Sequence, residues 1–370
     1  MVETPVDPAR VQRVAQDLRA RGHDVRTLED ARRDGVLRHD RRPSATPEAV
    51  GRTVDVGDLH RAFHQVRLAD RYDMATESHG GSKAHVVTHL VGRAGPRLPD
   101  SGEARRVLLG HLEAVFGIGP ATAARLRRDG VTSIARLPAV VRHQAAAAEV
   151  LAEWDEGDLD AISARLTRRL GGRGHLLSAL TCSLVAPEEV VYFDLETMGL
   201  WNNVAFLAGI GRVVDDGLVV RQFLAPGFAD EPAVISLALD ELARAKVVVT
   251  FNGRTADLPW LANRAFYHGL GPVPALVHVD LLYGTRRRFL HDQPLLEDVR
   301  LPTVAERLLG LPRPETDVPS ELIPRVYDHY ARDPDRRQGL LVPVLDHNRA
   351  DIEVLALLLE RLCQEAAPWP

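Results

Sequence analysis

Cysteine, lysine and long apolar segments are scarce in this sequence. Its two cysteines, Cys182 and Cys363, lie far apart in the chain, which argues against a disulfide framework and against a cysteine-based zinc site. No run approaches the roughly 20 apolar residues of a membrane-spanning helix, and the first residues lack the basic and apolar regions of a signal peptide. We therefore expect a cytoplasmic protein without a membrane partner.

The basic residues are nearly all arginines, because Lys83 and Lys246 are the only lysines. Guanidinium groups suit phosphate geometry, but codon composition alone would produce the same bias. The formal net charge of −5 neither indicates nor excludes nucleic-acid binding, since carboxylates that hold cations subtract charge that the cations return. The 370 residues, 45% of them hydrophobic, are enough for two or three globular domains.

One short apolar run, 190–197, carries two acidic residues. Its β-branched and aromatic residues predict a buried strand, in which alternate side chains share a face. Asp194 and Glu196 should therefore point the same way. Neighbouring carboxylates at the end of a buried strand repel each other unless a cation lies between them, and oxygen ligands suit Mg²⁺ or Mn²⁺. The alternative is an ordinary strand whose acids lie at a solvated end.

Two further acidic signals occur later in the chain. Asp257 follows a strand that ends at Asn252 and Gly253, and by itself it is most simply a helix N-cap. His347 and Asp351 are four residues apart, so they share one face of the last long helix. In isolation, such a pair is more often solvent-exposed and without a catalytic role than part of a catalytic site.

Hydrophobic periodicity predicts an α/β architecture for the second half of the chain. A meander of three strands is followed by alternating helices and strands, which gives a mixed sheet flanked by helices. The predicted strands are 190–197, 204–214, 218–224, 246–251 and 276–282. The predicted helices are 231–245, 259–268, 303–310, 323–331 and 348–365.

The N-terminal half reads as mainly α-helical. Residues 1–103 have helix-like spacing at 11–21 and 56–68, and loops at 80–82 and 92–99. Their arginines and histidines either contact phosphates or form a solvated surface, and we assign this region no chemistry.

Residues 104–180 form a second predicted region, with helices at 107–115 and 145–170. Between these helices, at about 111–140, Gly117-Ile-Gly119 allows a tight hairpin and Pro120 suits the first turn of a helix. This stretch resembles the helix-hairpin-helix motifs that hold a nucleic-acid phosphate on backbone N–H groups. The alternative is a helical hairpin that packs against the protein or a protein partner. The resemblance places these residues at or near the phosphate: Gly117, Gly119, Thr122, Arg125 and Arg128.

The three acidic signals occur together in the order of one known arrangement. Residues 188–364 resemble the DEDD group of ribonuclease H-fold 3′–5′ exonucleases, and most closely its YprB-like ribonuclease H-like branch. The supporting segments are 206–210, 278–288, 303–306 and 317–330. The resemblance implies a ribonuclease H-like domain at 186–366, DNA or RNA as the partner, and hydrolysis of phosphodiester bonds by a two-metal mechanism.

Specific residue roles follow from the resemblance. His347 corresponds to the general base, and Asn252 to a residue that either contacts the substrate or braces its turn. The histidine lies four residues before the last acid, where the tyrosine-type members of the group carry their tyrosine, and Ser320 stands at a frequent glycine position. The implied carboxylates, which would hold two Mg²⁺ or Mn²⁺ ions, are Asp194, Glu196, Asp257 and Asp351.

The sequence thus predicts a metal-dependent nuclease. Two alternatives stay open: a non-catalytic nucleic-acid-binding or scaffold protein that keeps the ribonuclease H fold, and a structure-specific endonuclease. DNA and RNA are equally compatible with the sequence, because no motif marks contacts to a 2′-hydroxyl.

Overall fold

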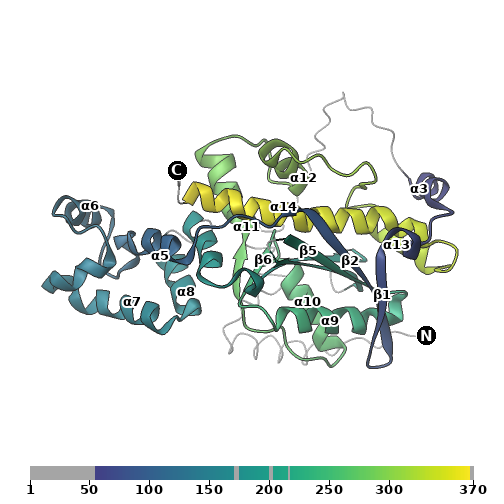
Figure 1. Cartoon of the computed structure of the whole chain (residues 1–370), viewed down its shortest axis with the longest axis horizontal. Coiled ribbons are helices and arrows are strands. Elements are labelled where there is room, and N and C mark those ends of the chain that lie inside the picture. The colour runs from purple at the N-terminus through teal and green to yellow at the C-terminus, as the bar shows by residue number, and fades with distance from the viewer. Residues whose placement is uncertain (1–54, 171–174, 200–202, 216, 367–370) are drawn as a thin grey trace, which may run out of the picture. The chain divides into compact units, whose positions relative to one another are not determined.

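The computed structural model describes residues 55–170, 175–199, 203–215 and 217–366. The predicted helix at 11–21 lies outside these residues. Among the described residues, one mixed sheet organises the fold, in the order β1-β2-β5-β4-β3-β6-β7 (Figure 1). Its strands are β1 (Asp73–His79), β2 (Ser82–Ala94), β3 (Val190–Thr197), β4 (Ala205–Val214), β5 (Gly217–Leu224), β6 (Val247–Thr250) and β7 (Val277–Asp280).

The strand pairing confirms the predicted mixed sheet. β1, β2, β5, β4 and β3 pair antiparallel in that spatial order, whereas β6 and β7 continue parallel from β3. The meander arises because short connections join β3, β4 and β5, and parallel strands require the longer crossovers that contain helices. All four residues of β6 are buried, as expected for a parallel strand covered on both faces.

Two strands were not predicted. β1 and β2 form a hairpin within residues 1–103, and β2 pairs along β5. The expected loop at 80–82 is the turn of this hairpin, but the loop expected at 92–99 begins only after β2 ends at Ala94. Polar side chains on β1, such as those of Asp73 and Glu77, hide the strand pattern because β1 is an edge strand with an exposed face.

Helices cover both faces of the sheet. The long helix α14 crosses β3, β4 and β5 on one face, and α9 and α10 lie on the other (Figure 1). Along β3, Tyr192 belongs to the hydrophobic cluster that includes Ile352 of α14, whereas Phe193 belongs to the cluster that includes Ile235 of α9. The helices after β5 are α9 (Glu231–Leu242), α10 (Asp257–Tyr267), α11 (Leu281–Thr285), α12 (Leu301–Thr303), α13 (Ile323–Ala331) and α14 (Val342–Ala366), with π-helical turns at Arg286–Asp292 and Val304–Leu308.

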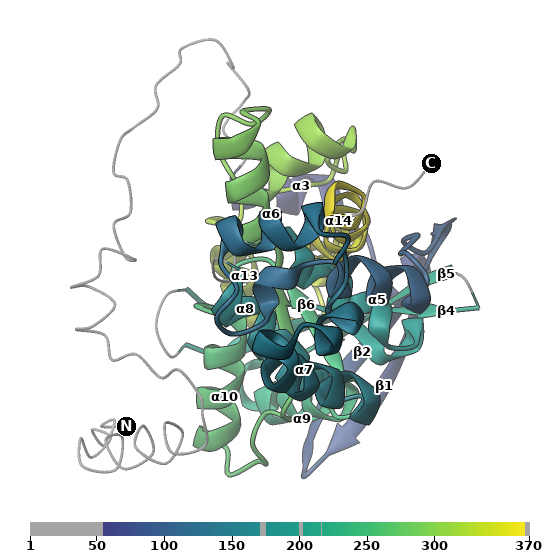
Figure 2. The same cartoon turned by 90° about the vertical axis from the view of Figure 1, so that its left-hand side faces the viewer.

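The N-terminal part is mainly helical, as predicted, but some of its boundaries differ. The helix expected at 107–115 is α5, which ends before Gly110. The single helix expected at 145–170 is two, because Gly157 adopts a left-handed φ of 67° and stops α7. The helices of this part are α3 (Val56–Phe63), α4 (Leu68–Arg71), α5 (Ser101–Leu109), α6 (Pro120–Arg128), α7 (Gln144–Glu156) and α8 (Leu159–Arg169). Of these, α5, α6, α7 and α8 face the viewer in Figure 2.

The last helix begins earlier than expected. α14 starts at Val342, six residues before the predicted start, and Pro343 occupies its first turn, where a missing N–H costs nothing. His347 and Asp351 therefore lie inside the helix, buried against the sheet. This burial distinguishes them from the surface pair that the spacing alone allowed.

Candidate active site

The two acids of β3 lie at the end of the strand and on the face that α14 covers. Val191 and Phe193 point into the opposite face, so alternation along the strand directs Asp194 and Glu196 toward the helix. Both carboxylates are partly buried. The strand thus presents two acidic side chains to α14 at the border of the core.

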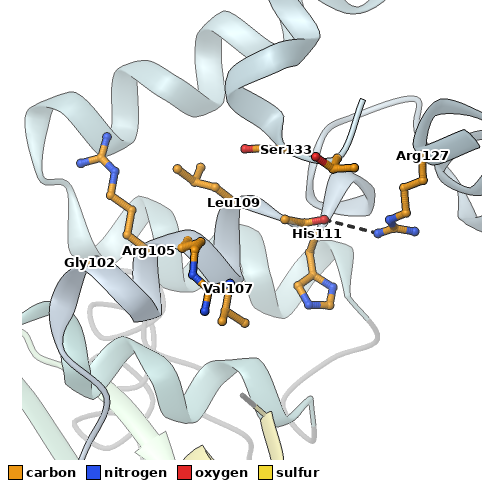
Figure 3. A pocket seen from close by; sticks show the side chains of 10 residues that line it. Gly102, Arg105, Val107, Leu109, His111, Arg127 and Ser133 are labelled. Carbon is orange, nitrogen blue, oxygen red and sulfur yellow. Dashed lines mark hydrogen bonds between the residues drawn. The ribbon is translucent and has the colours of Figure 1, made fainter. Parts of the chain in front are cut away.

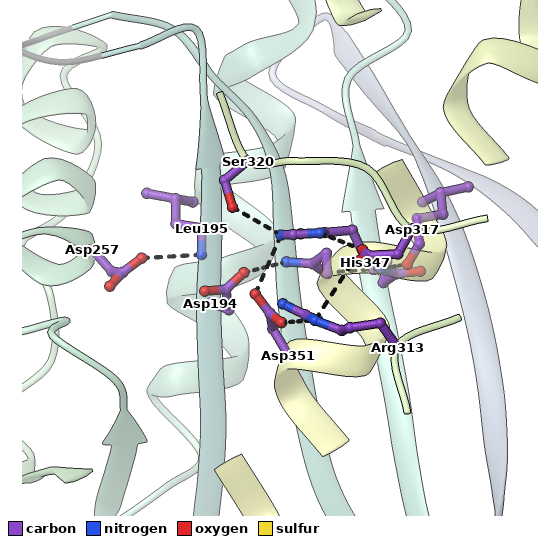
Figure 4. Close-up of polar contacts among 11 residues, drawn as sticks. Asp194, Leu195, Asp257, Arg313, Asp317, Ser320, His347 and Asp351 are labelled. Carbon is purple, nitrogen blue, oxygen red and sulfur yellow. Dashed lines mark hydrogen bonds and ion pairs between the residues drawn. The ribbon is translucent and has the colours of Figure 1, made fainter. Parts of the chain in front are cut away.

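Asp257, which follows β6 in the chain, contacts β3 on the side where β6 pairs with it. β6 ends at Thr250, which leaves an edge of β3 without a strand partner beyond that point. Asp257, the first residue of α10, fills this edge: its Oδ1 accepts a hydrogen bond from the Leu195 backbone N–H at 3.2 Å (Figure 4). Asp257 therefore bonds the strand that carries the other two acids.

The turn before Asp257 has its own support. Asn252 adopts a left-handed φ of 66°, and its side-chain Oδ1 accepts a hydrogen bond from the Thr255 hydroxyl at 2.7 Å. Asp280, at the end of β7, accepts hydrogen bonds from the backbone N–H groups of Asn252 at 2.8 Å and Arg254 at 3.0 Å. These contacts fix the path of the chain between β6 and α10.

His347 contributes an imidazole from α14, with 3% of its surface exposed. Its Nδ1 lies 2.7 Å from Oδ1 of Asp317, and its Nε2 lies 3.4 Å from Oδ2 of Asp351 (Figure 4). Ser320 Oγ lies 3.3 Å from the same Nε2. Asp317 orients the ring and fixes which nitrogen faces the acids.

Arg313 places a positive charge among these acids. Its guanidinium donates to Asp351, and its Nε lies 3.4 Å from Asp317. Arg313, Asp317 and Ser320 all belong to the segment between the second π-helical turn and α13, so this segment covers the α14 side of the acids (Figure 4). Sequence reasoning assigned no role to Arg313 or Asp317.

The acids raise one another's pKa. Burial, followed by the charges of Asp257 and Asp351, raises the pKa of Asp194 well above its usual value. Burial and the charge of Asp194 raise the pKa of Glu196 to about 8. Burial also raises the pKa of Asp257 to about 7, against backbone hydrogen bonds that lower it. Such shifts arise where carboxylates share a confined space, and they favour a cation there.

His347 has the complementary shift. Burial lowers its pKa, but the hydrogen bond to Asp317 and the charges of Asp351 and Glu196 outweigh burial and raise the pKa to about 9. The protonated ring therefore offsets negative charge of the acids around it.

The carboxylates accept hydrogen bonds from protein groups and do not surround a single position where a metal ion could bind. No group of three or more His, Cys, Asp or Glu side chains in the described part of the chain is already set out as a metal site. Asp194 accepts from Asn348, Asp257 from Leu195 and Asp351 from Arg313. Even so, the donor set consists of carboxylate oxygens whose mutual repulsion a divalent cation would relieve, so these residues fit Mg²⁺ or Mn²⁺.

The residues of the predicted helix-hairpin-helix lie in the helical region, away from this set in the chain. Gly117 has a left-handed φ of 80°, and Gly119 precedes α6, whose N-terminus no side chain caps. A Cβ atom at either glycine would meet nothing within 4 Å, so both backbones are open to an approaching group. Thr122 is partly exposed, and Arg125 and Arg128 are exposed.

A pocket of about 740 Å³ also lies in the helical region (Figure 3). Arg105, Arg106, Arg127 and His111 line it, but none of the five predicted phosphate-site residues does. Its arginines are paired with Asp155, Glu103 and Glu113 at 3.3, 3.1 and 2.9 Å. The pocket is therefore not the groove that the hairpin would present to a phosphate.

Comparison with known proteins gives the class of the domain that carries these acids. Residues 191–363 match the family model of the RNase H superfamily, so this part of the chain is a ribonuclease H-like domain. It is YprB-like: the uncharacterized protein YprB of Bacillus subtilis (strain 168) is 36% identical over 188 residues, 49% of this chain and 43% of YprB. The chain thus matches less than half of that relative's length.

A solved structure also matches. The family B DNA polymerase from the hyperthermophilic archaeon Pyrobaculum calidifontis aligns with a TM-score of 0.36 and 16% identity, covering 79% of this chain and 47% of the polymerase. This likeness is too slight to bear on function. Among the helices of the described residues, none combines the length and the hydrophobicity that a membrane span requires.

Proposed function

We propose that this protein is a metal-dependent nuclease that removes nucleotides from the 3′ end of DNA or RNA. One observation carries the proposal: Asp257 bonds the backbone of the strand that carries Asp194 and Glu196, and the charges of Asp257, Asp351 and His347 all act on Asp194, within a ribonuclease H-like domain. Nuclease activity requires several oxygen ligands and a proton acceptor in one place. These side chains supply both.

The proposed metal ligands are Asp194, Glu196, Asp257 and Asp351. Divalent ions bound there would activate water and stabilise the leaving 3′-oxygen. The protein's own contribution is a partly buried setting in which the raised pKa values of Asp194, Glu196 and Asp257 favour exchange of protons for metal.

The proposed proton acceptor is His347. Its Nε2 faces Asp351, while its Nδ1 is held by Asp317 at 2.7 Å. Asp317 therefore keeps Nε2 as the nitrogen that takes up a proton from the attacking water. Cations held by Asp351 and Glu196 would lower the pKa of the imidazole, because the charges of these two acids, after the hydrogen bond to Asp317, help to raise it.

We further propose that the hairpin at Gly117 and Gly119 binds the nucleic-acid backbone. The N-terminus of α6 has no side-chain cap, and the two glycines leave room for a phosphate oxygen to approach the backbone N–H groups. Exposed Arg125 and Arg128 would add charge nearby. Binding by this mechanism tolerates the net charge of −5 of the whole chain.

Cleavage of labelled strands tests the proposal. Purified protein would be incubated with Mn²⁺ or Mg²⁺ and with 5′-labelled single-stranded DNA and RNA of one sequence. We expect a ladder that shortens from the 3′ end, and we expect it to be absent with EDTA and in Asp194→Asn. A single discrete cut would indicate an endonuclease instead. No cleavage of single-stranded, duplex or branched substrates would favour the non-catalytic binding protein.

A further inference from the structure

A row of three residues crosses the sheet beside the proposed active site. Asp194 on β3 is opposite Gly209 on β4, and Gly209 is opposite Gln222 on β5. Gln222 is completely buried, and it is a polar residue on a strand face whose other members, Leu218 and Val220, are apolar. A buried amide in an apolar strand needs partners, and glycine between two polar residues leaves space above the sheet.

Asn348 of α14 fills that space. Its Nδ2 donates to Oδ2 of Asp194 at 2.7 Å, and its Oδ1 accepts from Nε2 of Gln222 at 2.8 Å. Asn348 has no exposed surface. One side chain therefore joins the polar residues of β3 and β5 across Gly209.

The direction of these hydrogen bonds is fixed by a backbone carbonyl. Nε2 of Gln222 also donates to the Leu345 carbonyl oxygen at 2.9 Å, and a carbonyl can only accept. Both amide hydrogens of Gln222 are thus assigned, so Oδ1 of Asn348 must accept and its Nδ2 must face Asp194. The Oε1 of Gln222 then faces His89 Nε2 at 2.8 Å, which must carry a proton.

We propose that His89, Gln222 and Asn348 form a positioning chain that holds Oδ2 of Asp194 and leaves Oδ1 directed to a metal ion. This inference rests on the proposed role of Asp194 as a metal ligand. His89 lies on β2, outside residues 191–363. The hairpin of β1 and β2 therefore contributes a residue to the proposed active site of the ribonuclease H-like domain.

Three substitutions remove one link each: His89→Phe, Gln222→Met and Asn348→Ala. His89→Phe is the mildest, because it keeps an aromatic ring against Tyr72, whose centroid lies 5.4 Å away, and removes the N–H donor. Loss of a hydrogen bond behind a metal ligand weakens metal binding or activity by about 10- to 100-fold. We expect the dissociation constant for Mn²⁺, measured by calorimetry on the full chain, to rise by at least about tenfold in Gln222→Met and Asn348→Ala.

The matched control is Tyr327→Phe. It also removes a buried donor, the hydroxyl that bonds the Ala225 carbonyl at 2.9 Å, but it makes no contact with the positioning chain. We expect it to lower the melting temperature and to leave the affinity for Mn²⁺ unchanged. Equal effects of Tyr327→Phe and Gln222→Met on Mn²⁺ affinity would indicate general destabilisation and would overturn the inference.

A double substitution tests whether the links act in series. If Gln222 acts on Asp194 only through Asn348, Asn348→Ala combined with Gln222→Met should weaken Mn²⁺ binding no more than Asn348→Ala alone. Multiplied effects would mean that Gln222 acts independently, and the chain would be wrong. A second readout is NMR of His89, in which we expect the Nε2–H tautomer in the wild type. The Nδ1–H tautomer would contradict the assigned directions.

The outcomes separate this inference from the proposed function. Wild-type protein that binds Mn²⁺ but cuts no substrate would refute the nuclease, whereas weaker Mn²⁺ binding by Gln222→Met would still support the chain. Wild-type protein that cuts, with variants that match it in Mn²⁺ affinity and kcat, would refute the chain alone. A wild type without Mn²⁺ uptake would overturn both.

Discussion

A Cβ atom on Gly209 would lie 2.2 Å from Oδ1 of Asn348. Side chains do not approach a Cβ atom this closely, so Asn348 can reach Asp194 only because residue 209 is a glycine. On the same strand and facing the same helix, a Cβ atom on Gly211 would lie 2.5 Å from Cγ2 of Ile352. The two glycines thus create similar space under α14, one beneath a polar and one beneath an apolar residue.

We predict different consequences for Gly209→Ala and Gly211→Ala. Each adds a methyl group to a packed interface, which costs about 1–3 kcal/mol of stability. Only Gly209→Ala should displace Asn348, and it should therefore lower kcat and Mn²⁺ affinity by about tenfold or more. Thermal unfolding, calorimetry and the cleavage assay on both variants provide the measurement. A similar loss of Mn²⁺ affinity in Gly211→Ala would assign the effect to movement of α14 as a whole.

Substitution of Asp317 should shift the pH dependence of cleavage. The hydrogen bond from His347 to Asp317 is the largest influence that raises the pKa of His347 against burial, so Asp317→Asn should lower that pKa. A general base with a lower pKa stays deprotonated to lower pH, and the acidic limb of the pH–rate profile should move to lower pH while kcat falls. Asp328→Asn, which removes the partner of Arg332, is a control. An unmoved acidic limb would exclude His347 as the base.

Much of the fold could be predicted from periodicity. The β3 and α13 boundaries at 190–197 and 323–331 are those expected, because β-branched runs and amphipathic spacing are strong local signals. The hairpin of β1 and β2 was missed because β1 is a polar edge strand, paired on one side only. Its role depends on pairing with β5, more than 100 residues later, which no local pattern encodes.

Some residues of the candidate site could likewise be predicted from the sequence, and others could not. Acidic residues next to apolar runs can be recognised in a sequence, because burying a charge costs free energy unless a partner or a cation compensates it. Gln222 carried a usable signal, an amide at an apolar position of a strand, and Asn348 directly follows the predicted base. Arg313 and Asp317 carried none, because their roles depend on how an irregular segment folds back over α14.

Without metal, the protein should lose stability as pH rises. Glu196 and His347 have folded-state pKa values of about 8 and 9, above the ordinary 4.5 and 6.5, and Asp257 has one of about 7, above 3.8. Each group therefore binds protons more tightly when folded, and its stabilisation is lost as pH rises toward the folded pKa. We expect the melting temperature in EDTA to fall between pH 6 and pH 9.

Divalent ions should reverse this trend. Because Mn²⁺ competes with protons for the carboxylates, the increase in melting temperature on adding Mn²⁺ should be larger at pH 8 than at pH 6. The double variant Asp194→Asn, Glu196→Gln provides the control, since the amides at these two positions neither titrate nor supply carboxylate ligands. A flat profile for the wild type in EDTA would contradict the pKa shifts, and an unchanged response to Mn²⁺ in the double variant would contradict the ligand assignment.

Substitutions in the hairpin should weaken binding without affecting the chemistry. Gly117→Val adds a side chain where a phosphate would approach and strains a φ of 80°, whereas Gly157→Val imposes similar strain at φ 67° between α7 and α8. A hydrogen bond to a charged group contributes about 1.5–3 kcal/mol, so Gly117→Val should raise the Kd for DNA or RNA roughly tenfold or more. Gly157→Val should not. Fluorescence anisotropy in the Asp194→Asn background measures binding without cleavage, and equal Kd values for both variants would assign the hairpin to packing or to a protein partner.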